Sequence, residues 1–176
     1  MTDFDALLEQ IRLARNDGHA AQARLAAETA VAAARASDDR SALARALCAL
    51  GTCARDQRDT TVAESCYAEA TALYRALGDD DRAAHALRHF ADVLANAGRF
   101  AEAAPIYDEV LALYDGLQLA APLDVANALR SCGICYERTQ RNADAHAAWS
   151  RAHVLYERAG IAAGVEESAR RIRTLS

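Results

Sequence analysis

The pattern closest to a reactive centre is Cys132-Gly-Ile-Cys135, because a Cys-x-x-Cys pair can bind zinc or carry out thiol redox chemistry. His146 and His153 follow it and could complete a set of four zinc ligands. Seven residues on a helix span about 10 Å, however, which is too far for both imidazoles to reach one tetrahedral ion. The surrounding residues also lack the βαβ pattern of a thioredoxin-like site. We therefore interpret Cys132 and Cys135 as small residues of the protein core.

Other kinds of catalytic centre find no support in the sequence. The serines lie mostly at predicted helix starts or on solvent-facing positions, and the chain contains no Gly-x-Ser-x-Gly elbow. Its 8 glycines are scattered singly, so no glycine-rich loop is available to hold a phosphate. The acidic run 79–81 is more simply a helix cap than an acid–base pair. The sequence thus predicts a non-enzymatic protein without cofactor or metal.

The composition predicts an all-helical protein, so the residues discussed above are expected to lie on helices or in the short turns between them. The chain has 176 residues, 52% of them hydrophobic, and alanine dominates that fraction. Alanine is the best helix former, while the few punctuating residues, 8 glycines and 2 prolines, indicate few or short loops. The net charge of -5 argues against a general nucleic-acid binder, because such proteins carry a basic surface or a concentrated basic stripe.

Several features predict a cytoplasmic, bacterial protein. The segment 1–9 is acidic and lacks the basic start of a secretory signal. No apolar run approaches the ~20 residues of a membrane span, so we expect no membrane association. The five cysteines lie within helical patterns, which suits reduced thiols in a cytosol. All basic residues other than histidine are arginine, which together with the abundant alanine is typical of a GC-rich bacterial genome.

A repeated pattern organises the whole chain. Its unit is a small residue, a ring four positions later and a small residue three after that, as in Ala63, Tyr67 and Ala70. The pattern recurs at Ala103, Tyr107 and Val110, at Ala145, Trp149 and Ala152, and, without a ring, at Ala23, Ala27 and Ala30. Subtracting the positions gives spacings of 40, 40 and 42. The rings Tyr67, Tyr107 and Trp149 are predicted to form a buried ladder.

Each repeat is interpreted as two helices joined by a short turn. In the second repeat, Ser41 is expected to cap a helix that runs to about Arg55. Residues 56–60 then form the turn, and a second helix follows over residues 62–77. Gly78 closes it, because glycine readily adopts the left-handed conformation that ends many helices.

We expect one domain over residues 1–176. It consists of four repeats, approximately 4–38, 41–78, 81–117 and 123–160, and a C-terminal capping helix over 165–175. The cap has an apolar stripe of Val165, Ala169 and Ile172 against polar residues, which suits a helix that covers the end of a repeat stack.

The chain resembles the tetratricopeptide repeat family. The resemblance rests on Gly51 and Gly133 in the first helices, on the turn glycine Gly98 and on the ladder of small residues and rings. It covers roughly residues 4–160. The units are longer than the usual ~34 residues and are similar to an extended 40–42-residue subtype. The fold class that this implies is all-α, a right-handed α-solenoid of four helix–turn–helix repeats.

The resemblance also implies that the first helices line a concave groove that binds extended peptides. The polar positions expected to face this groove, apart from Asp92, are Arg55, His85, Arg88, His89, Asn96, Asn127, Arg130 and Arg170. Arg88 and Arg130 occupy the same repeat position, and arginine presents a planar fork of donors to carboxylates. The alternative is that these arginines pair with neighbouring acids such as Asp92 and Glu137.

The leading hypothesis for function is a scaffold that binds another protein through an acidic peptide segment in this groove. A regulatory or sensory module that binds a small anion or short signalling peptide is an alternative. Self-assembly into a homo-oligomer through an exposed end face is another. A clamp for the C-terminal tail of a chaperone is disfavoured, because the asparagine position of that clamp holds Thr52, Asp92 and Ile134.

Overall fold

The computed structural model describes residues 3–116 and 121–175, and in these ranges the chain forms nine α-helices and no strand. The helices are α1 (Asp3–Asn16), α2 (Ala20–Ala36), α3 (Arg40–Asp56), α4 (Thr60–Ala76), α5 (Asp80–Asn96), α6 (Phe100–Gly116), α7 (Pro122–Arg138), α8 (Asn142–Ala159) and α9 (Ala162–Leu175). The predicted ends of the third repeat at residue 117 and of the domain at residues 1 and 176 lie outside the described residues. The all-helical class predicted from composition is confirmed.

Aspartates begin three of the helices. The side chain of Asp39 accepts a hydrogen bond from the amide of Ala42 at 2.9 Å, and Asp59 accepts one from Val62 at 3.3 Å. Asp79 does the same for α5, from Arg82 at 3.1 Å. These carboxylates satisfy amides that lack a partner within the helix and also oppose the helix dipole. The expectation that Ser41 caps α3 is wrong, because the helix begins earlier and its cap is Asp39.

Each short turn between two consecutive described helices contains one residue in the left-handed conformation. Glycine takes this place at Gly78, where φ is 70°, and at Gly160, where φ is 69°. Asp38, Arg58 and Gln140 take it elsewhere, with φ of 54°, 62° and 60°. A side chain in this region is strained, so the turn geometry overrides residue preference at these three positions.

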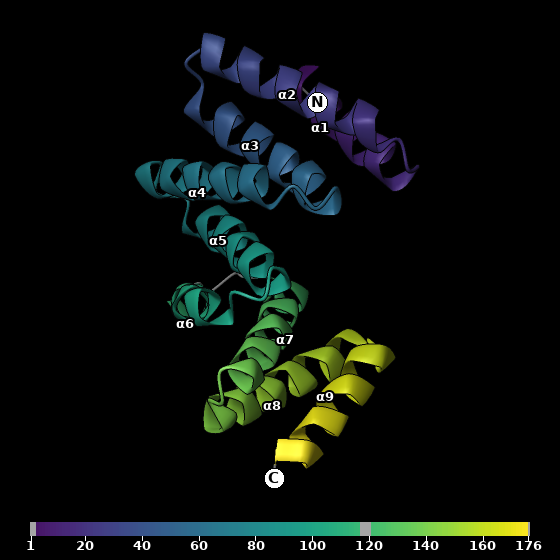
Figure 1. The fold of residues 1–176 in the computed structure, drawn as a ribbon, viewed down its shortest axis with the longest axis vertical. Coiled ribbons are helices and arrows are strands. Elements are labelled where there is room, and N and C mark those ends of the chain that lie inside the picture. Colours follow the sequence, from purple (N-terminus) through teal and green to yellow (C-terminus); the bar gives the residue numbers. More distant parts are fainter. Residues whose placement is uncertain (1–2, 117–120, 176) are drawn as a thin grey trace. The chain divides into compact units, whose positions relative to one another are not determined.

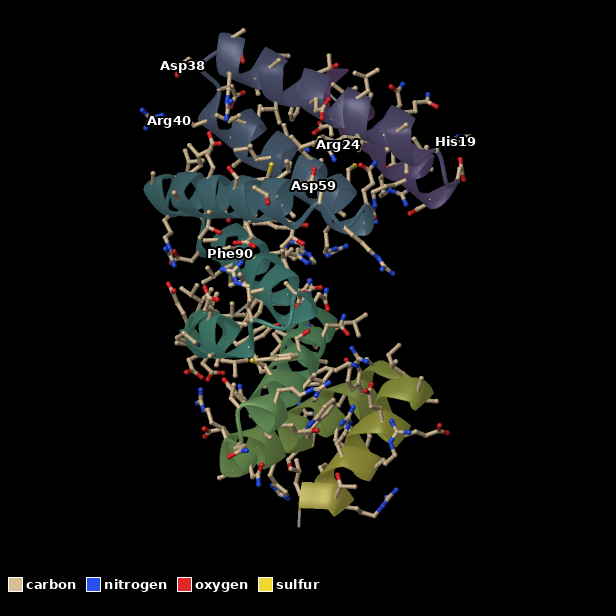
Figure 2. All side chains as sticks on the ribbon, in the orientation of Figure 1. His19, Arg24, Asp38, Arg40, Asp59 and Phe90 are labelled. Atoms are coloured by element: carbon tan, nitrogen blue, oxygen red, sulfur yellow. The ribbon has the colours of Figure 1, made fainter. Side chains whose placement is uncertain are left out.

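The first compact unit, Met1–Val93, contains α1 to α4 and most of α5. In Figure 1 its helices follow one another in antiparallel order. In Figure 2, Asp38 and Arg40 lie at one end of α2 and His19 lies at the other. Small residues such as Ala27 and Ala44 are fully buried between the helices, and Leu47 and Leu50 fill the larger spaces. The small size of the alanines lets neighbouring helices approach closely.

The second compact unit, Leu94–Ser176, contains α6 to α9. Trp149 of α8 and Tyr107 of α6 are buried in its core, with 0% and 1% of their surface exposed. Tyr67 holds the same position in the first unit and is also fully buried. The prediction that these three rings belong to the core is confirmed.

The packing of α9 differs from the prediction. Its buried residues are Gly164 and Ser168, whereas Val165, Ala169 and Ile172 are only partly buried. A Cβ on Gly164 would lie 2.5 Å from Cγ of Tyr156, so this glycine allows α9 to approach the ring. The close approach places the small residues, rather than the apolar stripe, against α8.

Pro105 lies inside α6, in its second turn. A proline at this position lacks the amide donor that would pair with the carbonyl of Ala101, four residues earlier. The helix nevertheless continues to Gly116.

Candidate functional site

In the first unit, four of the predicted groove residues meet around the ring of His89. Nη1 of Arg55 lies 3.1 Å from Nδ1 of His89, and Nη2 of Arg88 lies 3.1 Å from its Nε2. The ring of His85 meets the same imidazole edge-on, with centroids 4.6 Å apart. We call Arg55, His85, Arg88 and His89 the His89 cluster. It joins α3 to α5 and covers Tyr67 of the core, which stacks on His89 at 5.5 Å.

The carboxylate of Asp92 contacts two members of this cluster. Nη1 of Arg88 donates to Oδ2 of Asp92 at 3.0 Å, and Nδ1 of His89 lies 3.5 Å from the same oxygen. The expected pairing of Arg88 with Asp92 is therefore confirmed. Both side chains are largely buried, with 13% and 17% of their surface exposed.

Burial and the neighbouring cations govern protonation in the cluster. Burial lowers the pKa of His89, and the charge of Arg88 lowers it further, although a hydrogen bond to Asp92 acts in the opposite direction. One side of the His85 ring is open to solvent, yet the protein around the rest of it lowers its pKa as well. Both rings are therefore neutral at pH 7, and the positive charge of the cluster resides on its guanidiniums.

In the second unit, the predicted groove residues Asn127 and Arg130 lie on α7, and Arg170 lies on α9. Nε of Arg130 donates to Oε2 of Glu167 at 2.6 Å, and its Nη2 donates to Oε1 at 3.2 Å. The side chain of Arg130 remains 43% exposed, and Arg170 is exposed. Asn127 accepts a hydrogen bond from the hydroxyl of Tyr156 at 2.9 Å, so its side chain helps to hold α7 against α8. We call Arg130, Glu167 and Arg170 the α7–α9 surface.

The acid that pairs with Arg130 is Glu167 rather than Glu137. Glu137 instead accepts hydrogen bonds from Nε1 of Trp149 at 2.6 Å and from Nη1 of Arg171 at 2.8 Å. Glu137 and Arg130 both lie on α7 but two helical turns apart, whereas Glu167 comes from the neighbouring helix α9. Asn96, the remaining predicted residue, is exposed at the end of α5.

The cysteine pair behaves as a core feature. Cys132 and Cys135 are both fully buried, and Sγ of Cys135 lies 3.4 Å from the carbonyl oxygen of Phe100. Burial raises the pKa of Cys135 to about 11, which keeps it as a neutral thiol. Within the described part of the chain, no group of three or more His, Cys, Asp or Glu side chains is arranged to hold a metal ion.

A serine–histidine–glutamate arrangement was not predicted from the sequence. Oγ of Ser168 lies 3.0 Å from Nδ1 of His153, whose Nε2 lies 3.4 Å from Oε1 of Glu157. Ser168 is fully buried, and its hydroxyl donates to the carbonyl oxygen of Gly164 at 2.7 Å. A nucleophile needs access to its substrate and a hydroxyl proton directed at its base. Ser168 meets neither condition, so it holds α9 against α8.

The comparisons with known proteins agree with this architecture. The family model described as tetratricopeptide repeat matches residues 43–116. Residues 43–116 therefore consist of tetratricopeptide repeats. Repeats of this family generally serve as non-enzymatic scaffolds for protein–protein interaction. No curated protein sequence matches the chain.

Solved structures show the same fold at low sequence identity. BtubC (BKLC) from P. vanneervenii matches with a TM-score of 0.79 and 18% identity, over 92% of this chain and 67% of that one. The apo form of RapI matches with 0.80 and 12% identity over 98% of this chain, which spans only 47% of RapI. TPR-like repeats of a kinesin light chain from Podosopora anserina match with 0.70 and 13% identity, over 97% and 93%. The fold of the chain is thus an α-solenoid of helical repeats.

The helices were also compared with the requirements of a membrane span. Among the helices of residues 3–116 and 121–175, none combines the length and the apolar character that crossing a bilayer requires.

Proposed function

We propose that this protein binds an extended acidic peptide of a partner protein along its first helices. The observation that carries the proposal is the α7–α9 surface, where Arg130 and Arg170 occupy the same repeat position on neighbouring helices and both reach solvent. The fork of an arginine matches the geometry of a carboxylate, and its charge persists at any working pH. Two such forks on adjacent helices suit a chain with acidic side chains along its length.

The internal ion pair of Arg130 does not prevent such binding. Pairs between exposed charges contribute only about 0–1 kcal/mol, because water solvates both partners well. Because the side chain of Arg130 is 43% exposed, it can also contact a carboxylate of the partner while it remains paired with Glu167. Arg88 holds the same repeat position in the first unit but is only 13% exposed and bound to Asp92. We therefore expect Arg130 and Arg170 to contribute more to peptide affinity than Arg88.

The proposed site of action is the bacterial cytoplasm. Its support is the state of the cysteines, because Cys48, Cys53, Cys66, Cys132 and Cys135 are all free thiols. Free thiols persist in a reducing compartment, whereas secreted proteins generally oxidise theirs to disulfides.

The test compares peptide affinity between two double variants. A partner is captured from the native host, its acidic segment is synthesised, and the peptide is titrated against the whole chain. Arg130→Ala with Arg170→Ala should weaken binding by more than roughly tenfold, which is about 1.4 kcal/mol. Wild-type affinity should also fall as salt rises, because salt screens exposed charges beyond ~8–10 Å.

Arg75→Ala with Arg151→Ala is the matched control. Both residues are exposed arginines on second helices, α4 and α8, and the double variant carries the same change of net charge. Its affinity should remain close to that of the wild type. If the two double variants bind the peptide equally well, the first helices are not the binding surface.

A further inference from the structure

The His89 cluster contains more hydrogen-bond donors than acceptors. A guanidinium only donates, and a neutral imidazole has one donor nitrogen and one acceptor nitrogen. Arg55 faces Nδ1 of His89 and Arg88 faces its Nε2, each at 3.1 Å. Whichever nitrogen carries the proton, one of the two guanidiniums points at an N–H rather than at a lone pair.

A second observation shows the same shortage of acceptors. Nε of Arg88 is buried and has no hydrogen-bond partner among the described residues. A buried donor without a partner costs about 1–3 kcal/mol, and more where the group is charged. Natural proteins rarely leave such a group unsatisfied unless an ion, a water or a functional ligand meets it.

The charges are unbalanced in the same direction. Asp92 pairs with Arg88, while Asp56 is shared between Arg55 and Arg15, at 3.2 and 2.6 Å. The carboxylate of Asp92 therefore serves Arg88, whereas Arg55 has only a share of the carboxylate of Asp56, so the charge of the two cluster guanidiniums is not fully matched. An anion at the cluster would supply both the missing acceptors and the missing charge.

We propose that the His89 cluster binds a phosphoryl group, either as free phosphate or on a phosphorylated side chain of the bound peptide. A phosphoryl group suits the cluster better than a carboxylate does, because the guanidiniums that it would meet come from two helices, Arg55 from α3 and Arg88 from α5. Its three terminal oxygens and charge of about −1.5 to −2 can meet several donors at once. The inference rests on the proposal that the first helices form the binding surface. It adds the chemical group that α3 and α5 of the first unit would bind.

Histidine resonances report on this site directly. The side-chain NMR signals of His85 and His89 are followed while the whole chain is titrated with sodium phosphate, and sodium chloride keeps the ionic strength constant. Loss of single signals in His85→Gln and His89→Gln assigns them. Both signals should shift with phosphate concentration and reach saturation, whereas the signals of His19, His146 and His153 should show no saturating shift. A parallel titration with acetate should give a weaker response.

Three variants separate a specific site from general charge attraction. Arg88→Gln should weaken phosphate binding at least about tenfold. Arg82→Gln is the matched control on the same helix, because Arg82 is exposed and pairs with Asp79 at 2.9 Å, and its affinity should equal that of the wild type. Asp92→Asn removes the competing carboxylate and should tighten binding, so the inference remains testable even if Arg88→Gln destabilises the fold.

The outcomes distinguish the sources of the phosphoryl group. Saturable binding of inorganic phosphate supports the inference. So does binding of a phosphoserine peptide whose unphosphorylated form leaves the His85 and His89 signals unchanged. Shifts that rise linearly in both titrations, equal affinity for acetate, or equal effects of Arg88→Gln and Arg82→Gln would overturn it. None of these results depends on Arg130 and Arg170, so the peptide proposal stands or fails separately.

Discussion

Replacing Gly133 with alanine measures how closely α7 packs against the tryptophan of the core. A Cβ at this position would lie 2.7 Å from both Cε2 and Nε1 of Trp149. Carbon atoms in contact normally lie about 3.5–4.0 Å apart, so the ring would have to move. Trp149 has little freedom to do so, because it is fully buried and its Nε1 donates to Glu137 at 2.6 Å.

Three effects set the size of the change in stability. Alanine favours a helix over glycine by about 1 kcal/mol, which is a gain. Overpacking a dense core costs roughly 1–3 kcal/mol, and weakening the hydrogen bond to the charged Glu137 adds up to about 1.5–3 kcal/mol. We expect Gly133→Ala to lower the free energy of unfolding by about 1–3 kcal/mol. At roughly 2–4 °C per kcal/mol for a chain of this size, Tm should fall by several degrees.

Gly51→Ala is the matched control, because Gly51 holds the same repeat position and gains the same helix propensity. Its Cβ would lie 3.1 Å from Cζ of Tyr67, a shortfall that a small shift of the ring can absorb. This variant should therefore stay within about 1 kcal/mol of the wild type. Urea unfolding followed by circular dichroism measures both variants, and the fluorescence of the single tryptophan follows the second unit. A Gly133→Ala protein as stable as Gly51→Ala would refute the packing argument.

Two further predictions concern the second unit. Trp149→Ala should lower the free energy of unfolding by ~3–5 kcal/mol, as truncation of a large core ring does, and a loss under about 1 kcal/mol in the same urea experiment would contradict its burial. Burial alone would raise the pKa of Asp108, but hydrogen bonds from Arg141 and Tyr136 outweigh it and hold the pKa below the usual 3.8. The stabilisation by ionised Asp108 is therefore complete above pH 4 and is lost as the pH falls through the lowered pKa. Asp108→Asn should show a smaller drop in Tm than the wild type between pH 5 and pH 2, and identical drops would exclude this contribution.

Repeat spacing predicted most of the fold because packing between helices follows position in the repeat. Tyr67, Tyr107 and Trp149 were found by their common spacing, and all three are buried as predicted. The left-handed conformation of Asp38, Arg58 and Gln140 was not predicted, because only glycine signals a left-handed residue in a sequence. Short connections impose the same backbone there whatever the residue is.

Apolar periodicity was misleading at α9. The stripe of Val165, Ala169 and Ile172 marks an amphipathic helix, but amphipathicity does not say which face a neighbour approaches most closely. Gly164 and Ser168 lie against α8, because the ring of Tyr156 leaves no space for a larger side chain. Small residues at a contact were thus more informative than apolar ones.

The pairing of the groove arginines could be predicted only within one helix. Arg88 and Asp92 stand four residues apart, a spacing that places side chains on the same face. Arg130 finds Glu167 on the next helix, and Glu137 was named instead because it is nearer in sequence. The repeat position offered a clue to this pair. Arg170 holds the same repeat position as Arg130 on the neighbouring helix, and Glu167 lies one helical turn before Arg170.

Corresponding positions in the two units hold side chains of different charge. Arg55, Tyr67 and His89 of the first unit correspond, two repeats on, to Glu137, Trp149 and Arg171. In the second unit a carboxylate takes the place of a guanidinium, and Glu137 accepts from both Trp149 and Arg171. Nε of Arg171 is also buried and has no partner among the described residues, but the charge of Arg171 is matched by Glu137.

In the first unit the same place holds a second cation, Arg55, and the ring between the cations is a neutral imidazole rather than a carboxylate. The exchange of Glu for Arg at one repeat position therefore changes a self-sufficient ion pair into a cluster that lacks an anion. If so, restoring the acid with Arg55→Glu should remove the response of His89 to phosphate, because the new carboxylate would occupy the donors that the phosphoryl group needs. An undiminished response in that variant would mean that the cluster does not depend on its excess charge.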